Sequence, residues 1–185
     1  MFNKNENIGF IKGHMCSPAI ATQAEDLIAG GVKELIHVGY AGGLQPELVP
    51  GEIILTDGAF NDTAVARLYG YDYDIIHSSK DLTNEIEEMI TSAEILYKRG
   101  LHWTTDAGYR ETWGQVMDYR DKGALCVEME GVGLFTIANY RKCVATGIYV
   151  VSDVYLEDDW KLGWEGNDIK KAVGEIIDMI IKSIR

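Results

Sequence analysis

Short apolar runs rich in β-branched residues alternate with amphipathic helical segments along all 185 residues of the chain. Apolar runs bounded by Gly, Pro or polar residues are typical of buried strands. We expect strands at 35–39, 53–56, 101–105 and 144–151, and a further short apolar run at 124–127. We expect helices at 18–29, 83–99, 111–122 and about 129–140. Strands that alternate with helices predict a three-layer α/β/α sandwich around a central mixed sheet.

The last helix has the clearest pattern in the chain. Its apolar residues recur at steps of three and four, which places them on one face of a helix; they are Ile169, Val173, Ile176, Ile177, Ile180, Ile181 and Ile184. No linker, repeat or low-complexity tract divides the sequence. We therefore expect a single domain over residues 1–185.

The chain is strongly acidic, with 29 acidic against 17 basic residues and a formal net charge of -12. This charge repels nucleic acid and anionic membrane surfaces, and no basic patch offsets it, so we expect neither as a partner. No window reaches the roughly 18 unbroken apolar residues that a membrane span requires, and the first residues lack the apolar core of a signal peptide. We expect a protein that is neither embedded in a membrane nor exported by this route.

The cysteines and histidines indicate neither disulfides nor a metal site. The cysteines are odd in number, far apart and never arranged as CxxC, which favours a reducing cytoplasm; they are Cys16, Cys126 and Cys143. The histidines show no HxxxH or HxH spacing; they are His14, His37, His77 and His102.

Ligands of open α/β sheets bind beyond the carboxyl ends of strands, and three polar segments follow the predicted strands. The first is Gly39–Gly43. Its glycines allow a tight turn whose N–H groups, those of Ala41 and Gly42 among them, can bind an anion or a sugar oxygen. The alternative is a turn in which glycine serves only to reach a positive φ.

The second segment places two carboxylates, Glu128 and Glu130, on either side of Met129. A carboxylate can accept hydrogen bonds from the 2′- and 3′-hydroxyls of a ribose at once. Side chains two apart share a side only in an extended chain, so we expect one of the two to bind in this way. The alternative is that both lie on a solvated helix face near its N-terminus, where the macrodipole favours acids.

The third segment is Ser152–Asp153, at the end of a run without charged residues from Val144 onward. Desolvation of an acid in such a position would raise its pKa and suit it to proton donation. The alternative is an ordinary aspartate at a strand end.

Together and in this order, these segments resemble the nucleoside phosphorylase family, which includes purine nucleoside phosphorylases, uridine phosphorylases and methylthioadenosine nucleosidases. The resemblance extends from about Gly13 to the final helix and rests on five motifs: Ile36–Leu44, Gly51–Leu55, Thr104–Tyr109, Val127–Glu130 and Val151–Asp153. It implies cleavage of the N-glycosidic bond of a nucleoside, by phosphate or by water. It also implies a homo-oligomer, a dimer or a hexamer, and no cofactor beyond inorganic phosphate as a co-substrate.

The resemblance also implies roles for individual residues. Glu130 would bind the ribose hydroxyls, with Met129 under the sugar and Glu128 supporting the site. Tyr109 would stack on the base, and Asp153, beside Ser152, would donate to N7 of a leaving purine. The Gln/Arg pair of uridine-specific members is not found, so we favour purines. Such roles suit a transition state with a positively charged ribosyl and a departing base.

The sequence departs from the family at two places. Where phosphorylases hold phosphate with Arg and Ser or Thr, this chain has His37 and Tyr40, which are poorer phosphate ligands. It also starts near the segment 13–18, so we expect the family's first strand and helix to be lacking. The alternative function is a non-catalytic relative that binds a nucleoside or base, or assembles with a partner.

Overall fold

The computed structural model describes residues 8–157, 160–163 and 166–183. Its helices and strands follow in this order: α1 (Ser17–Ala29), β1 (Glu34–Gly43), β2 (Ile53–Asp62), α2 (Val65–Leu68), β3 (Ile75–His77), α3 (Lys80–Ser92), β4 (Tyr97–Thr105), a 3₁₀ turn (Gly108–Arg110), α4 (Trp113–Asp121), β5 (Cys126–Glu128), α5 (Gly131–Arg141), β6 (Val144–Tyr155), β7 (Trp160–Leu162) and α6 (Asn167–Ser183).

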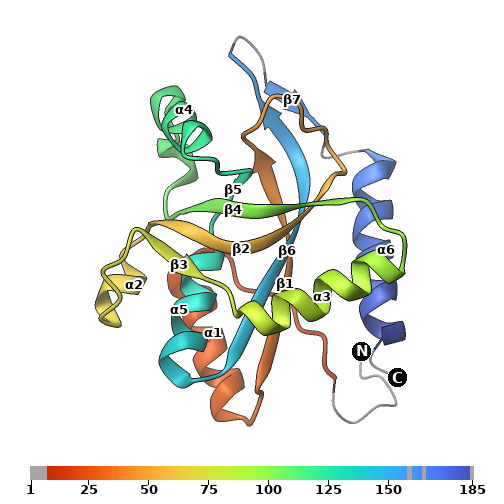
Figure 1. Ribbon diagram of the computed structural model, residues 1–185. Coiled ribbons are helices and arrows are strands. Elements are labelled where there is room, and N and C mark those ends of the chain that lie inside the picture. Colours follow the sequence, from red (N-terminus) through yellow and green to blue (C-terminus); the bar gives the residue numbers. More distant parts are fainter. Residues whose placement is uncertain (1–7, 158–159, 164–165, 184–185) are drawn as a thin grey trace.

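The described strands form one mixed sheet in the order β3-β2-β4-β5-β1-β6-β7 (Figure 1). β1 is parallel to β6, and β4 is parallel to β2 and to β5. β5 is antiparallel to β1, and β7 to β6. β2 also pairs with β6 through Ile53–Leu55, which closes the five central strands into a ring. The predicted mixed sheet is confirmed.

Helices cover the sheet on two sides, as the three-layer prediction required (Figure 1). On one side α1 and α2 pack on α5, which contacts β2, β3 and β6. On the other side α3 and α6 pack on each other and on β6. The predicted apolar face of α6 lies inward there, with Ile169, Ile176 and Ile180 buried. Ile184 lies outside the described residues.

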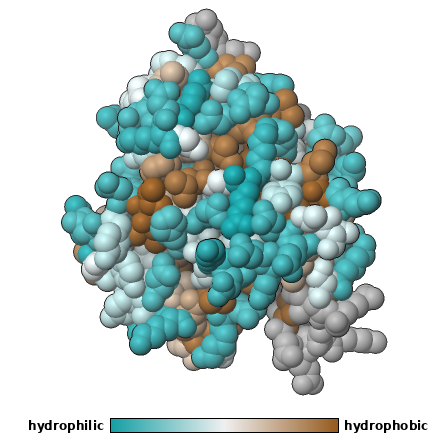
Figure 2. All heavy atoms as spheres, in the orientation of Figure 1, coloured by the Kyte–Doolittle hydropathy of each residue, from teal (hydrophilic) through white to brown (hydrophobic). Residues whose placement is uncertain are grey.

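The face shown in Figure 2 is mostly hydrophilic, with apolar side chains gathered in its upper half. Within the described ranges, no helix is long and apolar enough to cross a bilayer.

The predicted helix over 83–99 is wrong in its second half. α3 ends at Ser92, and β4 begins at Tyr97. Glu94 adopts a positive φ of 56° and so ends the helix without a glycine. Three short elements, α2, β3 and β7, were not expected from the pattern.

The Gly39–Gly43 segment is not the turn that the sequence predicted. It continues β1, which pairs with β6 as far as Gly43. Gly39, Gly42 and Gly43 are absent from the glycines that have a positive φ in the described chain. Their role must therefore come from close packing rather than from turn geometry.

Candidate functional site

Three adjacent strands bring two of the predicted segments side by side. Gly42 on β1 pairs with Val127 on β5 and with Asp153 on β6. Neighbouring strands lie about 4.8 Å apart, so the backbones at Asp153 and Val127 are separated by about 10 Å. The segment that contains Glu128 and Glu130 begins at this row. Asp153 does not follow the long strand, contrary to the sequence prediction, because β6 continues to Tyr155. This acid and the carboxylate pair nevertheless share one region of the sheet.

A β-bulge places Asp153. The pairing of β1 with β6 shifts between Ala41 and Gly42, which leaves Ser152 without a partner in the ladder, and such a bulge redirects the side chains that follow. The Ser152 hydroxyl lies 3.2 Å from the carbonyl oxygen of Ala41 and 2.5 Å from Oδ1 of Asp153. Oδ2 of Asp153 accepts a hydrogen bond from Nε1 of Trp160 at 2.7 Å. Asp153 is buried, and both of its carboxylate oxygens accept hydrogen bonds.

Glycine is required at position 42 because neighbouring side chains approach its backbone closely. A Cβ atom at this position would lie 2.8 Å from Cε2 of Tyr155 and 3.3 Å from Oδ2 of Asp153. Tyr155 stacks on Trp160, with ring centroids 6.0 Å apart and an interplanar angle of 15°. Its hydroxyl donates to Oε2 of Glu111 at 2.6 Å. The structure therefore adds Tyr155, Trp160 and Glu111 to the surroundings of Asp153, and no sequence pattern marks these three.

Glu130 occupies the N-cap position of α5. Its Oε1 accepts a hydrogen bond from the backbone N–H of Cys16 at 2.6 Å. Burial and the negative charge of Glu128 raise the pKa of Glu130 to about 7, against the opposing effect of backbone hydrogen bonds. Ser17 Oγ donates to the carbonyl oxygen of Met129 at 3.0 Å. The start of α1 therefore holds the Met129–Glu130 segment in place.

Glu128 is buried and bonded to protein groups through both oxygens. Oε1 accepts from Thr104 Oγ1 and lies 3.0 Å from Nε2 of His102. Oε2 accepts from the backbone N–H groups of Glu130 and Gly131, each at 2.8 Å. Burial alone would raise the pKa of Glu128, but the charge and hydrogen bond of His102, with that of Thr104, lower it to about 2. Of the pair, Glu130 is thus the less buried carboxylate.

His37 and Tyr40 lie on β1 before the bulge. Nδ1 of His37 is 3.5 Å from the hydroxyl of Tyr149, and the two rings meet edge to face at 5.6 Å. Burial lowers the pKa of His37. Two smaller effects oppose each other, because Glu128 raises this pKa and His102 lowers it. The ring is therefore biased toward its neutral form, which is a weak ligand for phosphate. Tyr40 is 48% exposed.

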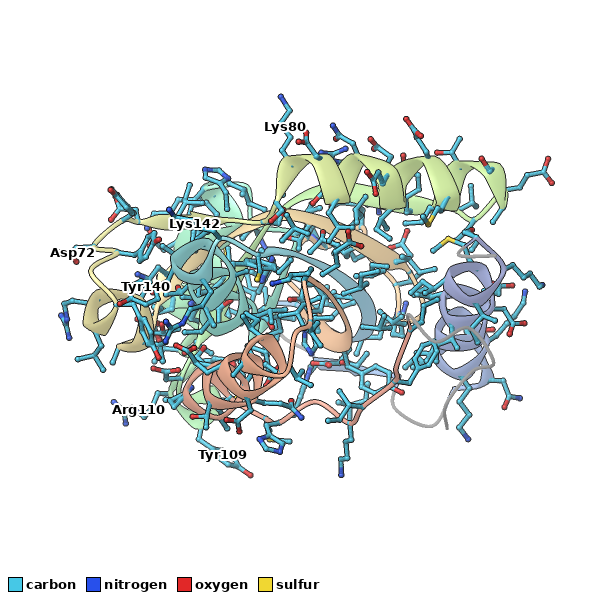
Figure 3. The ribbon with its side chains drawn as sticks, turned by 90° about the horizontal axis from the view of Figure 1, so that it is seen from below. Asp72, Lys80, Tyr109, Arg110, Tyr140 and Lys142 are labelled. Atoms are coloured by element: carbon cyan, nitrogen blue, oxygen red, sulfur yellow. The ribbon has the colours of Figure 1, made fainter. Side chains whose placement is uncertain are left out.

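Tyr109 lies on the 3₁₀ turn after β4 with its side chain fully exposed. Figure 3 shows Tyr109 and Arg110 projecting away from the body of the molecule. The turn itself is close to the site, since a Cβ atom on Gly108 would lie 3.8 Å from Sδ of Met129. Stacking of Tyr109 on a base stays a prediction, because in this single chain the ring does not lie over Asp153 or Glu130.

A hollow of about 370 Å³ opens near the end of β4, lined by Asn61–Ala64, Arg67, Asp72–Asp74 and Asp106. Neither Glu130 nor Asp153 lines it. In the part of the chain that the structure describes, no three His, Cys, Asp or Glu side chains are placed to hold a metal ion.

Comparison with known proteins gives the same family that the motifs indicated. Purine nucleoside phosphorylase DeoD-type of Exiguobacterium sibiricum is 32% identical over 139 residues, which cover 74% of this chain and 59% of that protein. The protein of the same name from Caldanaerobacter subterraneus subsp. tengcongensis is 33% identical over 156 residues, which cover 78% of this chain and 67% of that protein. The chain thus spans about 59% of the length of the first of these relatives.

A solved structure, described as the P knowlesi homolog of P falciparum PNP, matches with a TM-score of 0.75 and 21% identity. The match covers 89% of this chain and 66% of that one, and it shows that the fold is shared. The family model of the phosphorylase superfamily matches residues 7–182. A match over almost the whole chain, with the strand register and the carboxylates described above, shows that this chain belongs to the phosphorylase superfamily.

Proposed function

We propose that this chain cleaves the N-glycosidic bond of a purine nucleoside, by phosphorolysis or by hydrolysis. The observation that carries the proposal is the row formed by Asp153, Gly42 and Val127, which sets an acid beside the segment that ends in Glu130. An acid on one strand and a carboxylate that follows a strand close by could contact the base and the sugar of one nucleoside. The proposal is supported by membership of the phosphorylase superfamily and by the names of the relatives of this chain.

Each group has a defined role in the proposal. Glu130 accepts hydrogen bonds from the ribose hydroxyls, and its negative charge stabilises the ribosyl cation that develops as the bond breaks. Asp153, oriented by Ser152, donates to the departing base. Met129 packs under the sugar. In this proposal Asp153 and Glu130 are the catalytic residues.

The nucleophile is decided by one experiment. A panel of purine and pyrimidine nucleosides is incubated with the protein, with and without inorganic phosphate, and both base and sugar products are measured. Cleavage of purine nucleosides supports the proposal. Dependence on phosphate identifies phosphate as the co-substrate, and independence identifies water. Absence of cleavage of every nucleoside contradicts the proposal.

Two substitutions test the assignment of residues. Glu130→Gln and Asp153→Asn keep the shape of each side chain and remove its charge, and each is expected to lower kcat/KM by roughly a hundredfold or more. Glu88→Gln and Asp178→Asn are the matched controls, because both residues are exposed and lie on helices of the opposite side. An unchanged kcat/KM in either site variant would show that the assignment is wrong.

A second candidate function is binding of a nucleoside or base without cleavage. It is favoured by the hydrogen bond from the Trp160 indole to Oδ2 of Asp153. This bond already uses the carboxyl oxygen that would have to contact the nucleobase. Calorimetric binding of adenosine, inosine or free purines, combined with the absence of products, would support this candidate over the first.

We further propose that the chain forms a homo-oligomer, a dimer or a hexamer, in the cytoplasm. The fully exposed Tyr109 supports an assembly in which a neighbouring chain covers this turn. The three cysteines, all free, fit a reducing compartment. Light scattering of the purified protein measures the assembly, and a monomer at micromolar concentration would contradict it.

A further inference from the structure

A chain of buried polar groups runs from β2 to the start of α5 with His102 at its centre. The imidazole is completely buried and lies between Thr56 on one side and Glu128 on the other. Nδ1 of His102 is 2.6 Å from Thr56 Oγ1, and Nε2 is 3.0 Å from Oε1 of Glu128. The roles proposed above for Glu130 and Asp153 make no use of this histidine.

The hydrogen bonds of His102 link Thr56 to Glu128. The hydroxyl of Thr56 also lies 2.9 Å from the carbonyl oxygen of Gly58, so Thr56 and Nδ1 of His102 share one buried network. The Glu128 oxygen that faces Nε2 also accepts from Thr104, so a carboxylate there takes a hydrogen bond from the Nε2–H of His102. The ring therefore pairs with Glu128 through Nε2 and is held on its other side by Thr56.

His102 also touches the first residue of α5. A Cβ atom on Gly131 would lie 2.5 Å from Nε2 of His102 and 3.0 Å from the hydroxyl of Tyr149. Glu128, held by His102, accepts the N–H groups of Glu130 and Gly131. One imidazole thus fixes the start of α5 both by direct contact and through the carboxylate.

The geometry points to His102 as the positioning residue of the site: it keeps Glu128 in place as a buried anion, and Glu128 in turn orients Glu130 and sets the electrostatic field around it. The benefit to nucleoside cleavage rests on the proposed function, but the effect on Glu130 does not.

The charges that face Glu130 define what the loss of His102 would do. Glu128 on β5 is the near charge, Cys16 before α1 donates its N–H, and Tyr149 on β6 packs beside them. Without His102, which lowers its pKa, buried Glu128 would take up a proton. The negative charge next to Glu130 would then disappear, and the pKa of Glu130 would fall. If Glu128 stayed charged instead, the loss of His102 would leave the pKa of Glu130 unchanged or raise it.

The test is a pH titration of Glu130 followed by NMR of ¹³C-carboxyl-labelled glutamate in the full chain without ligand. Glu130→Gln identifies the resonance. The wild-type midpoint is expected near 7, and His102→Leu is expected to move it toward the ordinary value of 4.5. A midpoint that stays or rises in the folded variant would overturn the proposal.

Thr56→Val provides a second test in case the His102→Leu variant does not fold. This isosteric change is remote from Glu130 and acts on it through the bond to Nδ1 of His102, so it should move the midpoint in the same direction. Thr136→Val is the matched control, because its buried hydroxyl finds no hydrogen-bond partner among the described residues. The control should keep the wild-type midpoint, and an equal shift in it would overturn the proposal.

Enzyme activity provides a second, independent test of the role of His102. For the nucleoside that the panel identifies, His102→Leu is expected to lower kcat/KM by roughly ten- to a hundredfold, as misplacement of a reacting group does. The acid limb of its pH profile should move to lower pH, and His102→Gln, which keeps a donor to Glu128, should restore part of the rate. An unmoved pH profile in an active His102→Leu enzyme overturns the proposal. If the wild type cleaves nothing, the proposed function fails while the titration still decides the role of His102.

Discussion

Two carboxylates only two residues apart are held in opposite states by their surroundings. Glu128 is the more buried of the two, yet hydrogen bonds and the charge of His102 keep its pKa near 2. No cation is among the described groups that shift the pKa of Glu130, and burial together with Glu128 raises it to about 7. Hydrogen-bond partners, rather than depth alone, thus decide which acid is a structural anion and which can exchange a proton near neutral pH.

This difference predicts how stability depends on pH. Unfolded, Glu130 loses its proton near 4.5, whereas in the folded chain it keeps the proton to about 7. Between these values the folded state binds more protons, so Glu130 lowers the free energy of unfolding as pH rises, by at most about 3 kcal/mol. The contribution of Glu128 is complete above the ordinary value of 4.5 and is lost only as pH falls toward 2. Urea unfolding at about pH 5 and about pH 7.5 measures the slope.

Glu130→Gln removes the group that causes this slope. The variant is therefore expected to lose less stability than the wild type between the two pH values. Glu88→Gln, on the exposed face of α3, should retain the wild-type slope. Identical slopes for wild type and Glu130→Gln would show that the carboxyl group titrates alike in the folded and unfolded chain.

At the scale of whole elements, periodicity identified the strands and helices that have one buried face. The apolar face of α6 was read correctly because its residues repeat at helical steps over four turns. The extension of the helix over 83–99 was wrong because apolar spacing continues past Ser92, while the backbone turns at Glu94, a residue with no turn signature. Local spacing cannot report a helix end that tertiary packing imposes.

The site was predictable only in part for a related reason. The acids at 128, 130 and 153 stand out as charges at the ends of apolar runs. By contrast, His102 and Trp160 have no local signal, because their partners lie 26 and seven residues away and meet them only through strand pairing. Gly42 was noticed for its flexibility, but its use is to admit Tyr155 and Asp153.

The start of α1 provides a prediction at this scale. Cys16 is the N-cap residue, with no side-chain hydrogen bond and with φ 72° and ψ 151°. This region of backbone space belongs almost solely to glycine and costs about 1–3 kcal/mol for other residues. Cys16→Gly relieves the strain and keeps the N–H that binds Glu130, so we expect it to raise the free energy of unfolding by about 1 kcal/mol after the added freedom of unfolded glycine.

Cys143→Gly is the comparison for this change, since Cys143 is not among the described residues with positive φ. There glycine relieves nothing and should lower stability by roughly 0.5–1 kcal/mol. Urea unfolding of both variants measures the two effects. Equal destabilisation by both would show that Cys16 is not strained.

For the molecule as a whole, acidity is the dominant property. The formal net charge is -12, and the face shown in Figure 2 is mostly hydrophilic. Four of the acids counted in this charge lie around the candidate site; they are Glu111, Glu128, Glu130 and Asp153. Several ion pairs are partly exposed, such as Lys98 with Glu52 and Lys122 with Asp118. Exposed pairs contribute little each, so they offset only a small part of the overall repulsion.

Salt should therefore stabilise this protein at neutral pH. Raising the ionic strength from 0.01 M to 0.15 M shortens the Debye length from about 30 Å to about 8 Å, which screens repulsion between distant acids more than attraction within close pairs. We expect the melting temperature to rise by roughly 2–4 °C, the change that corresponds to about 1 kcal/mol in a domain of this size. Scanning calorimetry in sodium chloride and in choline chloride should give the same increase if screening is the cause. Near the sequence pI of 4.7 the net charge vanishes, and the increase should vanish with it. A melting temperature that falls with salt at neutral pH would mean that attraction within specific ion pairs outweighs the repulsion among the excess acids.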